Sequence, residues 1–297
     1  MRNLLVIVLL SSATLVAQSG STFKADAPIA CDQCGVWNAP REPFRVFGNT
    51  YFVGPGGLGS VLLVSDGGLI LLDGGLPQSA SSIDANIRKL GFRTENVRLI
   101  VNSHAHFDHA GGIAALQRAS GATVAASPAG AKAIEAGRPT SDDPQARSLG
   151  YPAAKNVRVV KDGETLRVGD LAITAHFTPG HTLGATSWTW RSCEGSRCLN
   201  IVYADSLNAV SDDGFKFTGD QTHPSLVDTM RRSIATVAAL PCDIILSVHP
   251  DFTDLDGKLK RRAASPATDP FIDPQGCRTY AAGALMRLDQ RIAQENK

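Results

Sequence analysis

The chain has almost no net charge, and it lacks internal repeats and long hydrophobic runs. Lysine and arginine number 29 against 28 aspartate and glutamate, and residues 1–17 contain only one charged residue, Arg2. A chain without these residues carries 28 charges of each sign, so nothing favours a polyanion and we expect no nucleic-acid partner. A hydrophobic content of 43% with 19% charged residues is typical of a soluble globular protein with one core.

No apolar run near the N-terminus reaches the roughly 20 residues that span a bilayer. The run at residues 4–10 follows a short positive start, is interrupted by two serines, and precedes small residues before Gln18. This arrangement is typical of a secretory signal. We therefore predict a cleaved signal peptide at residues 1–17, one exported mature domain at residues 18–297, and no membrane anchor.

The sequence also lacks the S-x-x-K and G-x-S-x-G motifs that carry serine nucleophiles. Ser103, Ser187 and Ser206 stand in neither pattern. A mechanism with a covalent serine intermediate is therefore not indicated.

One short stretch, by contrast, concentrates side chains that bind metals. Residues 103–112 read S-H-A-H-F-D-H-A-G-G and follow a strand-like apolar run. His104 and His106, two positions apart, point the same way and can share one ion. Asp108 and His109 can turn toward a second ion beside it. The pattern predicts a binuclear metal loop at a strand end; a surface histidine cluster or a satisfied buried pair is the disfavoured alternative.

Four further histidines lie outside this stretch. His181 follows a Thr-Pro-Gly turn, and His249 follows a strand-like apolar run. Loops that leave one edge of a sheet can converge on one site, so these two are candidate ligands. His176 and His223 are interpreted as structural or surface residues.

The rest of the pattern alternates strands with helices. Strands are expected at residues 44–48, 50–53, 60–65, 69–72, 97–101, 123–126, 157–160, 164–168, 171–176, 186–190, 199–203 and 244–248, and helices at 83–90, 113–120, 129–136, 226–239 and from 280. This alternation by itself indicates only an α/β fold. Residues 127–156 are long for a connection, so Leu149 and Tyr151 either wall a substrate cleft or belong to a solvated loop.

With these motifs the chain resembles the metallo-β-lactamase superfamily along nearly its whole length. Residues 178–182, 186–190, 203–207 and 247–250 make it similar to the third subclass of class B, the periplasmic di-zinc enzymes. The resemblance implies a four-layer αββα sandwich in a single domain. It also implies hydrolysis of penicillins, cephalosporins and carbapenems by a metal-bound hydroxide, and hence antibiotic resistance.

The resemblance assigns the six ligands residue by residue. The first zinc would be held by His104, His106 and His181, and the second by Asp108, His109 and His249. Three neutral nitrogens leave the fourth position of a tetrahedral zinc open, as in a catalytic site. Asp108 would have a second role, because its carboxylate would also orient the bridging hydroxide.

Other site residues follow from the same resemblance. Ser206 and Asn208 are expected to contact the substrate carboxylate, although Asn208 stands where serine or threonine is usual, which leaves the substrate profile open. Because Ser206 takes the inward place, we expect the preceding Asp205 not to bridge the metals. Asp73 is either a carboxylate that fixes a liganding imidazole or a turn former. Trp37 would lie at the lip of the cleft.

Six cysteines in an exported chain favour disulfides. Cys193 and Cys198 bracket a turn-like insert, so their spacing predicts a local hairpin bridge. The resemblance implies a bond between Cys242 and Cys277. It supplies no partner for the last two cysteines, because the loop at residues 54–59, where relatives carry one, has none.

Cys31 and Cys34 are therefore expected to bond to each other. A redox or metal role for this C-x-x-C pair is the less favoured alternative, because no thioredoxin-like strand and helix surround it.

Two other functions remain as alternatives. One is another hydrolase of the superfamily, either a thioester hydrolase or a lactonase; the signal peptide, the disulfides and residues 247–250 argue against it. The other is a non-catalytic periplasmic zinc-binding protein, which would not need an open coordination position. We expect small-molecule β-lactam substrates and a monomer, with an oligomer as the alternative.

Overall fold

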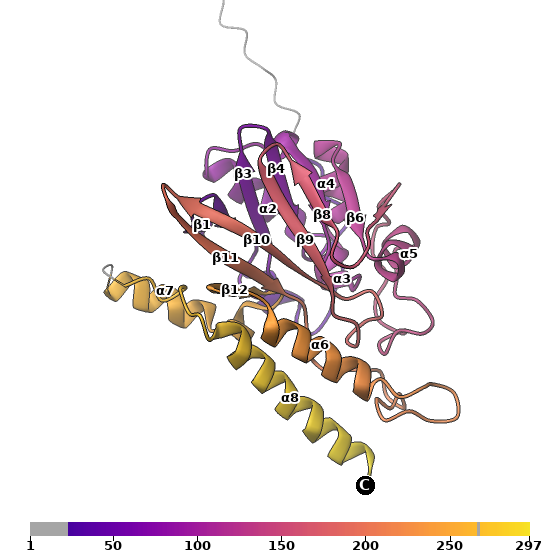
Figure 1. The fold of residues 1–297 in the computed structure, drawn as a ribbon. Coiled ribbons are helices and arrows are strands. Elements are labelled where there is room, and N and C mark those ends of the chain that lie inside the picture. Colours follow the sequence, from indigo (N-terminus) through magenta and orange to yellow (C-terminus); the bar gives the residue numbers. More distant parts are fainter. Residues whose placement is uncertain (1–22, 266–267) are drawn as a thin grey trace, which may run out of the picture.

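Two β-sheets pack face to face, and helices cover their outer faces (Figure 1). The computed structural model describes residues 23–265 and 268–297. The predicted signal peptide at residues 1–17 lies outside these ranges. The expected αββα order of layers is confirmed.

The first sheet has seven strands in sequence order. Its first four strands pair antiparallel and its last four pair parallel, with β4 belonging to both groups. The strands are β1 (Phe44–Phe47), β2 (Thr50–Phe52), β3 (Val61–Ser65), β4 (Gly68–Leu72), β5 (Val97–Val101), β6 (Thr123–Ala126) and β7 (Arg158–Val159). The helices of this half are α1 (Cys34–Trp37), α2 (Ser79–Lys89), α3 (Phe107–Ala110), α4 (Ile113–Ser120) and α5 (Pro128–Ala136), with a 3-10 turn at Thr94–Asn96.

The second sheet has five strands in the order β12-β11-β10-β9-β8. Only the β11–β12 pair is parallel among these described strands. The strands are β8 (Thr165–Val168), β9 (Leu171–Phe177), β10 (Thr186–Glu194), β11 (Arg197–Ala204) and β12 (Ile244–Ser247). The helices are α6 (Val227–Ala239), α7 (Leu255–Ala264) and α8 (Gly276–Glu295), with a 3-10 turn at Pro250–Thr253.

Strand β4 shows how the layers are specified. All five of its residues are buried. Because successive side chains of a strand point to opposite faces, Ile70 and Leu72 enter the core between the sheets, whereas Leu69 and Leu71 pack under the helices. A run that is apolar at every position fits a strand covered on both faces, and each fully buried leucine or isoleucine stabilises the fold by about 1.5–3 kcal/mol.

Helices α6 and α8 cover the outer face of the second sheet. The buried apolar residues of α6 recur at helical spacing: Met230, Ile234 and Val237. They belong to the same hydrophobic cluster as Ile245 of β12. A disulfide between Cys242 and Cys277 ties the start of α8 to the segment before β12. This half therefore holds the end of β12, and the residues that follow it, in a fixed position.

Several element bounds differ from the sequence expectations. Helix α7 was not expected, because only Leu255 and Lys258 of its ten residues are buried and it has no continuous apolar stripe. Helix α8 begins at Gly276 instead of 280. Strands β10 and β11 extend to the turn, so Cys193 and Cys198 are opposed partners within the strand ladder instead of flanking an insert.

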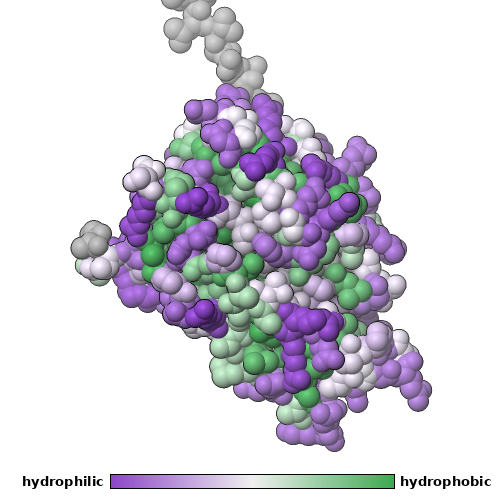
Figure 2. All heavy atoms as spheres, in the orientation of Figure 1, coloured by the Kyte–Doolittle hydropathy of each residue, from purple (hydrophilic) through white to green (hydrophobic). Residues whose placement is uncertain are grey.

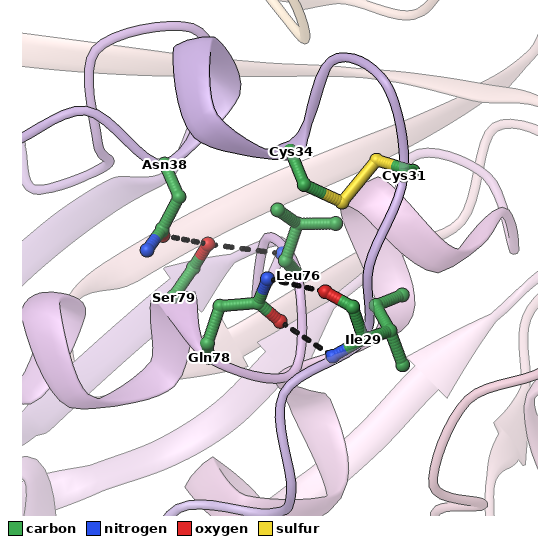
Figure 3. The surroundings of a disulfide bond; sticks show 7 residues. All are labelled: Ile29, Cys31, Cys34, Asn38, Leu76, Gln78 and Ser79. Carbon is green, nitrogen blue, oxygen red and sulfur yellow. Dashed lines mark hydrogen bonds between the residues drawn. A yellow bond between two sulfur atoms is a disulfide. The ribbon is translucent and has the colours of Figure 1, made fainter.

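All three expected disulfides are confirmed: Cys31–Cys34, Cys193–Cys198 and Cys242–Cys277. Figure 3 shows the first of them beside Leu76. The Gln78 side chain donates to the Ile29 carbonyl (2.9 Å) and accepts from the Ile29 N–H (3.2 Å), which fastens the N-terminal segment to the start of α2. Three disulfides are typical of an extracytoplasmic protein.

The outer surface carries mixed character. On the face in Figure 2, hydrophobic residues are interspersed with hydrophilic ones. Across residues 23–265 and 268–297, none of the helices combines the length and apolar character needed to cross a membrane.

Candidate metal centre

The candidate ligands lie beyond the ends of three strands. His104 and His106 follow β5, His181 follows β9, and His249 follows β12. The first two strands belong to different sheets, and the inward packing of both sheets brings their ends together. The site is therefore built across the edge of the sandwich.

The loop after β5 owes its shape to a short helix and to glycine. His106 caps α3 in an extended conformation, and its carbonyl accepts from the His109 N–H (3.1 Å), so the chain turns sharply between the two histidines. At Gly112 a Cβ atom would lie 2.2 Å from the Gly74 carbonyl oxygen. The loop after β4 can thus approach the metal loop only because no side chain intervenes, and Gly74 donates to the His109 carbonyl (2.8 Å).

His104, His106 and His181 form the first ligand set. Their ring centroids lie 4.7 to 5.0 Å apart, and one nitrogen of each lies within 4.8 Å of the others. All three rings are buried. The structure therefore brings together the three residues that the resemblance assigned to the first metal.

In each ring of the first set, an oxygen atom holds one nitrogen. The three pairs are His104 Nδ1 with Asp205 Oδ1 (2.6 Å), His106 Nε2 with Asp143 Oδ1 (3.1 Å), and His181 Nδ1 with the Asn208 carbonyl (2.9 Å). The opposite nitrogen of His104, Nε2, is buried and has no partner among the described residues. A buried nitrogen costs free energy unless something binds its lone pair, so this donor set fits a metal ion.

The second ligand set converges equally closely. Asp108 Oδ2 lies 3.2 Å from His109 Nε2 and 3.5 Å from His249 Nε2, and the two nitrogens are 3.3 Å apart. The remaining nitrogen of His249 faces the Gly57 carbonyl (3.2 Å). Ligand atoms of His104, Asp108 and His109 also lie within 4.8 Å of one another, so the two sets are adjacent.

Burial and neighbouring charges set the protonation states. Burial, with His106 next to it, lowers the pKa of His181 to about 3, and burial with His109 lowers that of His249 to about 4. Both rings are neutral at pH 7, with lone pairs for a metal. Burial raises the pKa of Asp108, but the positive charge of His109 and its hydrogen bond to the carboxylate outweigh burial, so the net pKa lies below its ordinary value and the carboxylate is ionised.

The position of Asp73 does not match the expectation that its carboxylate fixes a liganding imidazole. It lies 4.0 Å from His109 Nδ1, too far for a hydrogen bond. Its oxygens instead accept from Ser103 N (2.8 Å), Ser103 Oγ (2.6 Å), Asn102 Nδ2 (2.9 Å) and Tyr203 OH (2.9 Å). Asp73 therefore anchors the beginning of the metal loop, and it does so as a strand-end residue with a positive φ of 58°.

Asp205 is fully buried and contacts His104 on the side away from the ligand groups. Neither ligand group includes it. Ser206 is buried beside it, and the Asn208 carbonyl holds His181. The Asn208 side-chain oxygen accepts from Arg287 Nε (2.5 Å), a contact that the sequence did not indicate.

The remaining sequence candidates lie around the centre. The Trp37 ring is tilted against His249 and Phe107, with ring centroids 5.5 Å and 6.1 Å away. Tyr151 is buried and its hydroxyl donates to the Ala105 carbonyl (2.7 Å), so it supports the metal loop instead of walling a cleft; Leu149 is 41% exposed.

Two further histidines lie outside the candidate metal centre, and two polar residues that the sequence did not indicate lie beside it. His176 pairs with Thr189 (2.8 Å), and His223 lies on the surface, so the first is structural and the second is a surface residue. Asp143 and Gln145 were missed: the Gln145 amide lies 3.5 Å from His106 Nδ1. An aspartate and a glutamine in a polar loop give no periodic signal that would distinguish them from solvated residues.

Comparison with known proteins agrees with this geometry. The Metallo-beta-lactamase superfamily matches residues 53–194. The structure is similar to the Rm3 metallo-beta-lactamase, with a TM-score of 0.88 and 51% identity over 91% of this chain and 100% of that one. It is also similar to MEM-A1, a subclass B3 metallo-beta-lactamase isolated from a soil metagenome library, with a TM-score of 0.85 and 50% identity over 88% and 98% of the two chains.

A hydroxyacylglutathione hydrolase of Maricaulis maris is more distant, at 25% identity over 60% of this chain and 70% of its own. The chain belongs to the metallo-β-lactamase superfamily. Within that superfamily, its structural relatives place it with the subclass B3 metallo-β-lactamases, which are metal-dependent hydrolases.

Proposed function

We propose that the protein is a periplasmic di-zinc β-lactamase that hydrolyses the amide bond of penicillins, cephalosporins and carbapenems and thereby confers antibiotic resistance. The observation that carries the proposal is the pair of adjacent ligand sets. One nitrogen of each ring in the first set lies within 4.8 Å of the others, and the three ligand atoms of the second set lie 3.2 to 3.5 Å apart. The signal peptide expected at residues 1–17 would direct the chain to the periplasm, and its substrates would be small molecules.

The ligand chemistry favours zinc in both positions. The first set offers three imidazole nitrogens, and the second offers two nitrogens and one carboxylate. Zinc accepts both donor types in tetrahedral sites and keeps a position open where only three protein ligands bind. We therefore assign His104, His106 and His181 to the first zinc and Asp108, His109 and His249 to the second.

Zinc, when bound, lowers the pKa of a coordinated water to about 7 and so supplies a nucleophile and a Lewis acid at neutral pH. The residues around it control that chemistry. Asp108, ionised at pH 7, can accept a hydrogen bond from the attacking water and so orient it toward the lactam carbonyl. The burial of the histidines excludes other water and strengthens each electrostatic contact within the site.

Substrate contacts are proposed from the neighbouring loop. Arg287 donates to the side-chain oxygen of Asn208. That contact leaves the N–H groups of the Asn208 amide as donors for the substrate carboxylate, together with the Ser206 hydroxyl. A cavity of about 620 Å³ beside His249, lined in part by Trp37 and Phe252, offers an apolar wall for a substituent of the lactam.

The deciding experiment is hydrolysis of a chromogenic cephalosporin and a carbapenem by the purified mature protein. Turnover is expected with both, with no effect of serine-directed inhibitors. An acyl-enzyme trapped on any serine would contradict the mechanism. The similarity to a hydroxyacylglutathione hydrolase makes thioester hydrolysis the second candidate, so the same preparation is assayed with a glutathione thioester; turnover of the thioester alone would replace our proposal.

A further inference from the structure

The segment between α5 and β7, residues 138–156, is fastened directly to the metal loop. Tyr151 OH donates to the Ala105 carbonyl (2.7 Å), between the two histidines of the first set. The same segment is held from its other side, because the Pro144 carbonyl accepts from Asp212 N (2.9 Å) and Arg147 N donates to Asp212 Oδ2 (2.7 Å). It therefore has fixed contacts with both the metal loop and the loop after β11.

Asp143 is the residue of this segment that reaches an imidazole. Its side chain is 6% exposed, and Oδ1 lies 3.1 Å from His106 Nε2. The Gln145 N–H donates to the same oxygen (2.7 Å), which fixes the orientation of the carboxylate. An aspartate is rarely buried to this extent without such partners.

The contact determines which nitrogen of His106 carries a proton. A carboxylate accepts only, so Nε2 must be the protonated nitrogen, and Nδ1 keeps its lone pair. The same logic applies to His181, because the Asn208 carbonyl that faces its Nδ1 can only accept. For His106, however, the acceptor comes from a long polar connection and not from the end of a core strand.

We propose that Asp143 is a positioning residue of the first metal site, and that the 138–156 segment thereby completes this site. Asp143 holds the His106 ring in the tautomer and orientation that direct Nδ1 toward the metal. The inference rests on the metal centre of the proposed function but does not require that β-lactams be the substrate. Loss of such an acceptor typically costs 10–100-fold in metal affinity.

The test compares the zinc affinities of metal-free wild type, Asp143→Ala, Asp143→Asn and Asp142→Ala by competition with a chromophoric chelator. Asp142 is the matched control, because it is the adjacent aspartate and is exposed. Asp143→Ala should weaken first-site zinc about 10–100-fold and leave the second site unchanged. Asp143→Asn, which keeps an acceptor oxygen, should recover most of that loss, and Asp142→Ala should behave as wild type.

Two further readouts separate positioning from a general loss of structure. Thermal unfolding of the metal-free variants shows whether each one folds. Nitrogen–proton correlation spectra of wild-type imidazoles report the tautomer of His106 directly, and we expect the proton on Nε2. The inference is overturned by a proton on Nδ1, by wild-type first-site affinity in Asp143→Ala, or by an equal loss in Asp142→Ala.

These outcomes are distinct from a failure of the proposed function. Wild type that binds two zinc ions with the expected difference between variants, yet turns over no β-lactam, would contradict the β-lactamase proposal and leave the role of Asp143 intact.

Discussion

The two ligand sets are supported to different degrees. Each imidazole of the first set has its distal nitrogen held by an oxygen from a separate segment. In the second set, His109 Nδ1 is buried without a partner among the described residues, and the nearest carboxylate, Asp73, is 4.0 Å away. The His249 side chain is 15% exposed, whereas each histidine of the first set is 8% exposed or less.

This difference indicates that the first site is the more preorganised one. A ring whose tautomer and orientation are fixed before the metal arrives loses little further freedom on binding. We therefore expect the two zinc ions to be held unequally, with the second released first.

Removal of both metals should abolish activity. Chelator titration, followed by metal counting in a native mass spectrum and by carbapenem hydrolysis, should show one zinc lost before the other. Added zinc should restore turnover. Simultaneous loss of both ions at every chelator concentration would contradict the inequality.

Removal of one ligand from each set should then separate the two sites. His106→Ala should lose first-site zinc and essentially all turnover. His249→Ala should keep one zinc, lose the second, and turn over roughly 100-fold more slowly, equivalent to about 2.7 kcal/mol of barrier. Metal counting beside hydrolysis decides the point; a His249→Ala protein that retains two zinc ions and full activity would show that His249 is not a ligand.

Changes at Asp205 test the support of the first set alone. Asp205→Asn keeps an oxygen that can accept from His104 Nδ1, so it should retain two zinc ions and most of the activity. Asp205→Ala removes that acceptor and should weaken first-site zinc about 10–100-fold. If Asp205→Asn instead falls to one zinc and becomes inactive while His249→Ala stays active, Asp205 bridges the metals and the thioester-hydrolase alternative should be preferred.

The smallest effect concerns acid stability of the metal-free protein. His181 and His249 have folded-state pKa values of about 3 and about 4, below the ordinary 6.5. Between pH 6.5 and 4 these two residues bind more protons in the unfolded chain than in the folded one, so their contribution to stability should fall as pH is lowered through this window. Asp205, whose pKa burial raises, contributes in the opposite direction. Thermal unfolding from pH 7 to 4 measures the decline, and His249→Gln should reduce its slope. A melting temperature that does not change across the window would contradict the neutral rings.

The metal loop was readable from sequence because its four candidate ligands lie close together in the chain. His104, His106, Asp108 and His109 occupy six positions after one apolar run, a density that a core does not require. Strand β4 was predicted at residues 69–72, because four apolar residues in a row after a glycine turn fit a buried strand, and the structure adds Gly68 to it. Helix α7 was missed for the opposite reason: two buried residues in ten do not make a periodic signal.

The sequence by itself determined the types and local spacing of the metal ligands, the apolar strands that carry them and the cysteines that bond. These properties depend on neighbours along the chain. The tertiary structure decided which oxygen holds each imidazole: Asp205 and not Asp73, a backbone carbonyl for His181, and Asp143 from a polar connection. Such contacts join residues 27 to 101 positions apart, and hydrogen bonds over those separations depend on how the sheets pack, which local sequence does not encode.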